Sequence, residues 1–148
     1  PYLTSITKQR DVMQFTTNEM LFYTNLNTGE LIPWQAESFS YTDDFMSATI
    51  TLRDGVTWAD GMPFTSADVK FTLEAVRDAP PEINGSASFN EWIATVDAPD
   101  PLTVVITFNK PAPRFVRDFL ALGHENHYPI LPAHIWQGED IATFTNYD

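Results

Sequence analysis

The stretch from residue 46 to residue 78 constrains the fold more than any other part of the chain. Residues 46–53, MSATITLR, alternate apolar and polar side chains with a period of two, which predicts a strand with one buried face. Asp54-Gly55 and Asp60-Gly61 then mark two turns, because both residue types tolerate positive φ. The residues between them, VTW, predict a short return strand or an extended arm.

A capped helix follows the second turn. Thr65 is predicted as its N-cap, and Asp68 occupies the third helical position, where a capping box places an acidic or amide side chain. Phe64 and Val69 flank the cap at the spacing of a hydrophobic staple. The helix over residues 66–78 aligns apolar side chains on one face and should end before Pro80-Pro81.

The other segments predict strands and helices in mixed order. They are a helix over 11–23, a loop over 79–90, strands over 93–96 and 102–108, a helix from Pro113 with Leu122 inward and Gly123 as its C-cap, a short helix after Pro132 and a helical turn over 140–144. Apolar residues on both faces of 102–108 predict a central strand. We expect an α+β fold with a small, mixed, mostly antiparallel sheet and two or three packed helices, forming one domain over residues 1–148.

Composition narrows the classes of partner. The chain has 20 acidic and 8 basic residues and a formal charge of −12, which repels nucleic acid and anionic lipid. No apolar run approaches the roughly 18 residues of a membrane span, so direct membrane insertion is not expected. The absence of cysteine excludes disulfides and thiol catalysis. Because the chain begins at Pro1 without a methionine, we expect a processed or excised piece.

Catalytic and metal motifs are weak in this sequence. His124 and His127 have a helical metal-ligand spacing, but Gly123 and Pro129 argue against a helix there, so neither a metal nor another cofactor is predicted. Asp60 and Glu91 are the carboxylates that a glycosidase would use. No nucleophile elbow, phosphate loop or dinucleotide fingerprint is present, so we predict no enzyme activity.

Two other hypotheses remain open at this point. One is a carbohydrate-binding or glycoside-active domain that uses the aromatic and acidic residues. The other is an interaction domain whose partner covers an exposed apolar face. Among the tryptophans, Trp58 and Trp136 are predicted to be core or interface residues, and Trp92 lies with Phe89 beside the loop over 79–90.

Residues 29–76 resemble the family 5 extracellular solute-binding proteins of ABC transporters. The shared positions are Gly29-Glu30, Pro33, Ala36-Glu37-Ser38, Leu52-Arg53, Gly55-Val56, Trp58, Asp60-Gly61, Pro63, Thr65, Asp68-Val69 and Phe71. Segments APDPLTVVITFNKPAPRF and PILPAHIW continue the resemblance, with Asn109 and Ala133 departing from the family pattern. The similarity extends from about residue 19 to the end.

The resemblance implies a subdomain of the first lobe of a two-lobed, periplasmic-binding-protein type II-like fold. It implies a periplasmic or extracellular, membrane-associated parent protein that captures a peptide or oligosaccharide by lobe closure and delivers it to the membrane permease of an ABC transporter. By position, the loops over 84–92 and 123–128 would reach the rim of the cleft, so the expected ligand contacts are Phe89, Trp92, His124 and Asn126. A chain separated from its lobe would expose apolar surface around Trp34, Phe144 and Tyr147 and dimerise through it.

Overall fold

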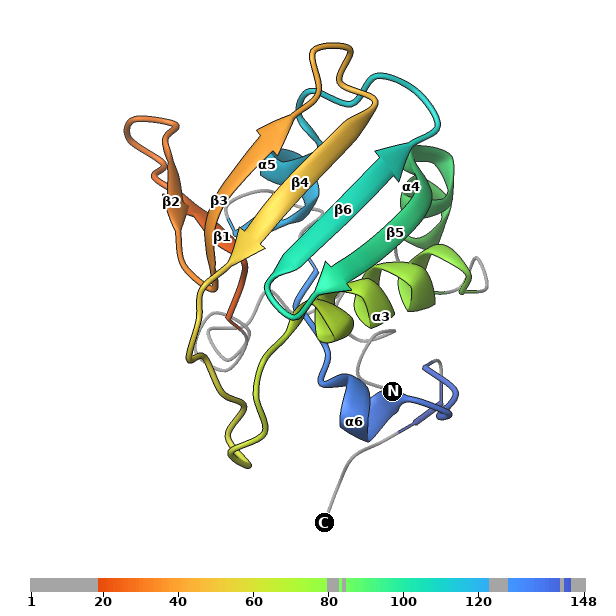
Figure 1. Ribbon diagram of the computed structural model, residues 1–148. Coiled ribbons are helices and arrows are strands. Elements are labelled where there is room, and N and C mark those ends of the chain that lie inside the picture. The colour runs from red at the N-terminus through yellow and green to blue at the C-terminus, as the bar shows by residue number, and fades with distance from the viewer. Residues whose placement is uncertain (1–18, 80–82, 84, 123–127, 142, 145–148) are drawn as a thin grey trace.

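The computed structural model describes residues 19–79, 83, 85–122, 128–141 and 143–144 of the chain (Figure 1). The strands are β1 (Phe22–Thr24), β2 (Leu31–Pro33), β3 (Ala36–Tyr41), β4 (Ser47–Leu52), β5 (Ile93–Asp100), β6 (Thr103–Phe108) and β7 (Ala121–Leu122). The helices are α3 (Ser66–Arg77), α4 (Ser86–Trp92), α5 (Phe115–Phe119) and α6 (Ala133–Trp136). This mixture of two sheets and short helices confirms the predicted α+β class.

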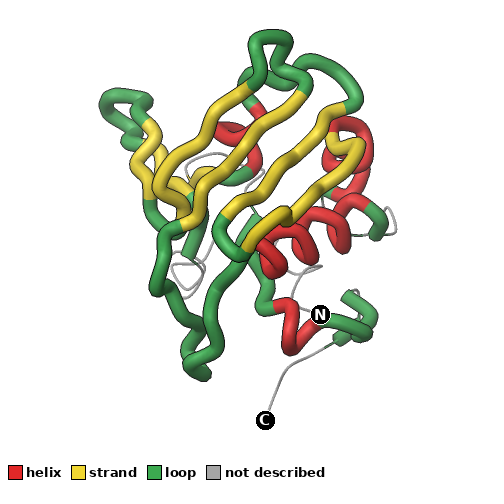
Figure 2. The backbone as a smooth tube through the Cα atoms, in the orientation of Figure 1, coloured by secondary structure: helices red, strands yellow, loops and turns green. Residues whose placement is uncertain are grey.

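The larger sheet is antiparallel throughout, with the strand order β3-β4-β6-β5 (Figure 2). In β4, Ala48, Ile50 and Leu52 are buried and alternate with partly exposed residues, as the period of two predicts. Ile50 pairs with Val104 of β6, and both side chains are fully buried. Strand β6 lies between β4 and β5, which confirms the predicted central strand.

The smaller sheet has the order β2-β1-β7, with β1 antiparallel to β2 and parallel to β7. It corrects part of the predicted helix over 11–23: residues 22–24 form β1, and residues 11–18 lie outside the described part of the chain. Met20, Leu21 and Phe22 are consecutive and all buried. Such a run suits a chain segment covered on both sides, and its helical spacing was therefore misleading.

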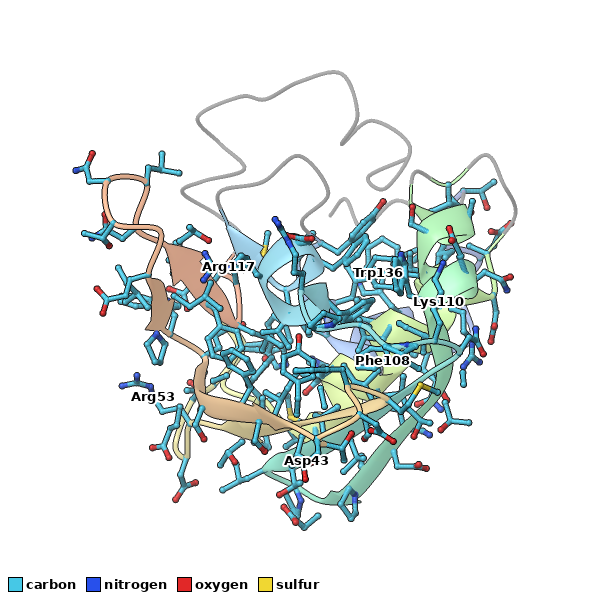
Figure 3. The ribbon with its side chains drawn as sticks, turned by 90° about the horizontal axis from the view of Figure 1, so that it is seen from above. Asp43, Arg53, Phe108, Lys110, Arg117 and Trp136 are labelled. Carbon is cyan, nitrogen blue, oxygen red and sulfur yellow. The ribbon has the colours of Figure 1, made fainter. Side chains whose placement is uncertain are left out.

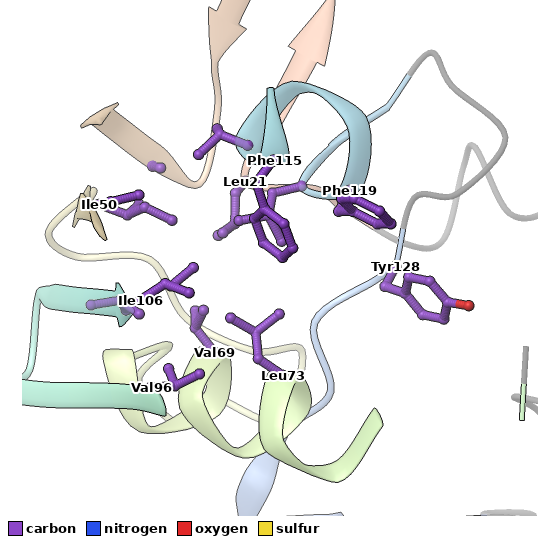
Figure 4. Close-up of a cluster of buried hydrophobic side chains, with 14 of the residues drawn as sticks. Leu21, Ile50, Val69, Leu73, Val96, Ile106, Phe115, Phe119 and Tyr128 are labelled. Carbon is purple, nitrogen blue, oxygen red and sulfur yellow. The ribbon is translucent and has the colours of Figure 1, made fainter. Parts of the chain in front are cut away.

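Helix α3 packs against one face of the larger sheet. Its side chains Val69, Leu73 and Val76 are fully buried, and Figure 4 shows Val69 and Leu73 facing Val96 and Ile106 of the sheet. The Thr65 N–H donates to Asp68 Oδ2 over 2.8 Å, which is the acidic half of the predicted capping box. The predicted helix and its start are therefore confirmed.

Two other helices differ from the sequence expectation. Helix α4 occupies residues 86–92, within the predicted loop over 79–90, because Gly85 at φ 82° starts a short helix that buries Phe89. Helix α5 ends at Phe119, and Ala121–Leu122 pairs with β1 instead. Leu122 is thus not helical and the C-cap of α5 is Leu120, because strand pairing of residues 121–122 satisfies the backbone that a longer helix would have used; Gly123, the predicted C-cap, lies outside the described residues.

The remaining predicted turns are present. Thr57 bridges Pro63, and the Trp58 N–H donates to the Met62 carbonyl over 2.8 Å, so Asp60-Gly61 does reverse the arm. The short helix α6 begins after Pro132, and the Phe144 N–H donates to the Asp140 carbonyl over 2.8 Å as in a helical turn. None of the helices in the described residues has the length and apolar character of a membrane span.

Candidate ligand-contact region

Tyr128 joins α4 to the chain that follows α5. Its ring lies 4.8 Å from the Phe89 ring in a T-shaped arrangement, and its N–H donates to the Phe119 carbonyl over 3.4 Å. At Gly85 the approach is closer still, since a Cβ placed there would lie 1.8 Å from the Tyr128 hydroxyl oxygen. The described ends of the two predicted rim loops, 84–92 and 123–128, therefore meet at Tyr128.

The Tyr128 phenol is a buried group. The ring is 4% exposed, and burial raises the pKa of Tyr128 to about 12. The hydroxyl is therefore neutral at physiological pH and serves as a hydrogen-bonding group in a packed interior. Sequence reasoning placed this residue in an irregular segment, and only the contact with Gly85 identifies it as the element that joins the two loops.

Phe89 lies in the core and not on a rim. It is completely buried, and its ring contacts those of Phe115, Phe119 and Tyr128 at centroid distances of 6.0, 5.4 and 4.8 Å. The Phe115 and Phe119 rings of this group also stack on each other at a centroid distance of 4.8 Å (Figure 4). The Phe89 side chain thus holds α4 against α5 and positions the surface around it.

Trp92 reaches the surface at the other end of α4. The Lys110 Nζ lies 4.0 Å from the centroid of its ring, and Lys110 also forms an ion pair with Glu91. The ring borders a hollow of about 280 Å³, whose other walls are Ala112, Pro113, Arg114, Phe115, Asp118 and Phe119. His124 and Asn126 lie outside the described residues, so Trp92 is the one predicted contact that the structure places at a surface hollow.

A second hollow, of 420 Å³, lies between the β1–β2 hairpin and α5. Its walls are Thr24, Asn25, Leu26, Gly29, Arg114 and Arg117. Figure 3 shows Arg117 on α5, and its Nη1 donates to the Gly29 carbonyl of the hairpin. The sequence analysis did not predict this hollow. Its only local indication in the sequence is the pair of arginines, Arg114 and Arg117, three residues apart.

The two carboxylates of the glycosidase hypothesis have separate basic partners. Asp60 Oδ2 lies 2.7 Å from His134 Nε2, whereas Glu91 pairs with Lys110. The hydrogen bond from His134, followed by that from the Met62 N–H, holds the pKa of Asp60 below its ordinary value. Across the described ranges, no three His, Asp or Glu side chains lie close enough together to bind a metal ion.

The other aromatic candidates occupy the core or its margin. Trp136 is 6% exposed and its ring lies 4.9 Å from that of Phe144, which confirms its predicted core position. Trp58 packs against Phe64 at 5.5 Å, and its Nε1 is buried without a hydrogen-bond partner among the described residues. Trp34 is 47% exposed, and Tyr147 lies outside the described residues.

Sequence relatives of this chain are binding proteins. The probable peptide-binding protein YejA of Agrobacterium fabrum is 32% identical over 107 residues, which make up 70% of this chain and 16% of that protein. The glutathione-binding protein GsiB of Escherichia coli K12 is 34% identical over 112 residues, or 74% of this chain and 21% of that protein. The chain therefore spans about a fifth of the length of these relatives.

Solved structures of similar fold belong to the same kind of protein. NikZ from Campylobacter jejuni, in complex with Ni(L-His), is 29% identical with a TM-score of 0.73, covering 86% of this chain and 24% of that one. The periplasmic oligopeptide-binding protein of an ABC transporter from Thermotoga maritima is 32% identical with a TM-score of 0.69, covering 82% and 21%. Residues 30–146 match the family described as bacterial extracellular solute-binding proteins, family 5, middle. This chain belongs to family 5 of the bacterial extracellular solute-binding proteins.

Proposed function

We propose that this chain is part of the substrate-binding protein of an ABC importer and helps to capture a peptide or peptide-like ligand. The observation that carries the proposal is the family match over residues 30–146, joined with relatives named for peptide and glutathione binding. The parent protein acts in the periplasm or outside the cell and passes its ligand to a membrane permease.

Capture by this protein requires no bond-making chemistry. The region around α4 and α5 offers aromatic rings and paired charges: Glu91 with Lys110, and Arg114 with Asp118. Such surfaces bind by apolar contact and by orienting hydrogen bonds. A ligand would be enclosed between this chain and the rest of the longer protein as the lobes close.

Trp92 is the described residue that we assign to ligand contact. Its ring borders the hollow of 280 Å³ and carries a lysine ammonium on its face, so it presents both an apolar edge and a nearby positive charge. A hydrophobic peptide side chain next to a carboxylate fits this combination. His124 and Asn126 remain proposed contacts on the neighbouring loop.

An oligosaccharide is the second candidate ligand. The observation that favours it is the mannohexaose-bound structure of the Thermotoga maritima protein, which is 29% identical to this chain with a TM-score of 0.67. Tryptophan rings stack on sugars as readily as on apolar side chains. The family fold alone therefore does not separate the two classes of ligand.

Titration of the longer protein distinguishes a peptide ligand from an oligosaccharide ligand. Calorimetry with tri- to pentapeptides, glutathione, cellobiose, laminaribiose and mannohexaose should give saturable binding of a peptide or of glutathione. Binding of a sugar alone would replace the proposed ligand class. Trp92→Ala should weaken the affinity for the peptide at least about fivefold, because losing the ring removes about 1 kcal/mol of contact energy. Phe45→Ala, which removes an exposed ring outside the hollow, is the matched control.

We also propose that the isolated chain self-associates through the exposed face of the β1–β2 hairpin. Tyr23 and Ile32 are paired across the hairpin, and the Trp34 ring lies 5.4 Å from that of Tyr23. Ile32 and Trp34 are 46% and 47% exposed, so this face is apolar and accessible. Sedimentation of the chain and of its Trp34→Ser variant tests the proposal, since a monomer at high concentration in both would contradict it.

A further inference from the structure

The hollow between the β1–β2 hairpin and α5 collects groups that bind anions. Arg114 and Arg117 reach it from the α5 side, and Thr24, Asn25 and Gly29 border it from the hairpin. We infer that this hollow is a binding site for a small anion that carries a carboxylate or a phosphate group. Arg114 borders both hollows, but Trp92 and the two predicted rim loops do not border this one, so the inference can be tested separately from the peptide-binding proposal.

Among the described residues, no carboxylate forms an ion pair with Arg117. Four other cations in the described residues each form an ion pair: Lys70 with Glu74, Arg77 with Asp78, Lys110 with Glu91, and Arg114 with Asp118. The Arg117 residue is partly buried, and its Nη1 donates to the Gly29 carbonyl. In a chain of net charge −12, a partly desolvated cation left with a carbonyl alone is unusual, and a bound anion would compensate its charge.

Arg53 provides the comparison. It also lacks a carboxylate partner in the described part of the chain, and its Nε donates to the Trp34 carbonyl over 2.8 Å. Arg53 is exposed, however, and does not border the hollow. Its charge is therefore solvated by water, whereas that of Arg117 faces a concave surface.

The hairpin adds two polar groups to the site. Thr24 Oγ1 is buried and has no hydrogen-bond partner among the described residues, so its hydroxyl is left to donate. Asn25 Oδ1 accepts the N–H groups of Asn27 and Thr28 over 3.0 and 3.3 Å. These bonds fix the side chain of Asn25 and leave its amide nitrogen as the donating end.

The guanidinium geometry defines the class of ligand. The planar fork of an arginine matches the paired oxygens of a carboxylate or a phosphate and can donate two parallel hydrogen bonds to them. Arg114 is 70% exposed and holds Asp118 at 3.2 Å in a surface ion pair, so it can turn toward an anion at little cost. Because Asp118 offsets part of the Arg114 charge, Arg117 supplies the larger share of the positive potential.

Titration of the 148-residue chain with inorganic phosphate and, separately, with succinate tests the inference. At constant ionic strength, ¹H–¹⁵N spectra should show saturable shifts at the amides of Thr24, Asn25 and Gly29. Arg117→Gln should weaken this binding at least about tenfold, as expected for a charged hydrogen-bonding pair. Arg53→Gln should leave it unchanged. Saturation by either anion supports the site, and the stronger of the two identifies a carboxylate or a phosphate as the preferred group.

Two more variants keep the test decisive if Arg117→Gln disturbs the hairpin. Thr24→Val removes the hydroxyl at nearly constant shape and should weaken binding severalfold. Arg117→Lys keeps the charge but not the fork, and should bind more weakly than the wild type and more tightly than Arg117→Gln. Shifts that rise linearly without saturation for both anions, or equal effects of Arg53→Gln and Arg117→Gln, would overturn the inference.

Discussion

The carboxylate of Asp68, in the first turn of α3, accepts the N–H of Ala133 at the start of α6 over 2.8 Å. Its other oxygen accepts the Thr65 N–H, also over 2.8 Å. One turn further along, the Thr72 hydroxyl oxygen accepts the Leu131 N–H over 2.8 Å. Helix α3 thus holds the segment that follows the predicted rim loop over 123–128. The Asp68 side chain that caps the helix also fixes the start of α6 by a tertiary hydrogen bond.

Asp68→Ala should destabilise the protein by about 2 to 4 kcal/mol, because it leaves the Thr65 and Ala133 N–H groups without their acceptor in a buried place. Urea denaturation measures the loss. Asp68→Asn keeps one oxygen acceptor and should cost less. Glu74→Ala, which removes an exposed ion pair with Lys70 on the same helix, should cost under about 1 kcal/mol. Equal losses of unfolding free energy for Asp68→Ala and Glu74→Ala would show that the hydrogen bonds of Asp68 do not stabilise the fold.

Gly85→Ala should be much more disruptive than Gly138→Ala. Both glycines have positive φ, 82° and 92°, so the backbone strain of a side chain is similar at the two positions. At Gly85 the added Cβ would lie 1.8 Å from the Tyr128 hydroxyl oxygen, whereas at Gly138 no atom lies within 4 Å. The clash should add about 1 to 3 kcal/mol to the loss of unfolding free energy. If thermal unfolding shows the same loss of stability for Gly85→Ala and Gly138→Ala, the close contact between Gly85 and Tyr128 is contradicted.

Trp58 should tolerate phenylalanine but not alanine. Its ring is partly buried against the core, so Trp58→Ala should cost about 3 kcal/mol through the lost packing. Its Nε1 has no hydrogen-bond partner in the described structure, so Trp58→Phe gives up no bond and should cost about 1 kcal/mol or less. Chemical denaturation compares the two variants. A large loss for Trp58→Phe would mean that the indole nitrogen does bind a partner.

The contact between Asp60 and His134 should make part of the stability depend on acid pH. Hydrogen bonds from His134 and the Met62 N–H hold the pKa of Asp60 below its ordinary 3.8. A carboxyl group with a lowered folded pKa stabilises the fold at pH above its unfolded pKa, and this contribution is lost as the pH falls through the folded pKa. Thermal unfolding between pH 7 and about pH 2 should therefore decline less steeply in Asp60→Asn than in the wild type.

Asp43→Asn is the control for this measurement, because Asp43 is an exposed carboxylate on the turn between β3 and β4. Its acid profile should follow that of the wild type. If Asp60→Asn and the wild type decline in parallel, the contact with His134 does not contribute to stability.

Features decided within a few residues could be predicted from the sequence. The period of two in β4, the turn at Asp60-Gly61 and the Thr65–Asp68 cap depend on neighbouring side chains, and all three are present. The two-residue strand β7 could not be predicted, because its backbone partner β1 lies about a hundred residues earlier in the chain. The same applies to α4, whose formation depends on burial of Phe89 among rings from α5 and from Tyr128.

The surface hollows were less predictable than the core. The hollow at the hairpin brings Arg117 to Gly29 across 88 residues of sequence, and no periodicity reports such a contact. Phe89 looked like a loop residue because Gly, Ser and Asn surround it, but its burial outweighs that composition. Trp92 borders a surface hollow, and its contact with a ligand remains a prediction.

Parallel calorimetric titrations of the isolated chain and of the longer protein test the central claim most directly. If the chain supplies only one side of a ligand cleft, a tripeptide or glutathione should bind the longer protein saturably and give no measurable heat with the isolated chain, because half a cleft buries too little of the ligand. Micromolar binding by the isolated chain, or no binding of any peptide by the longer protein, would contradict the account.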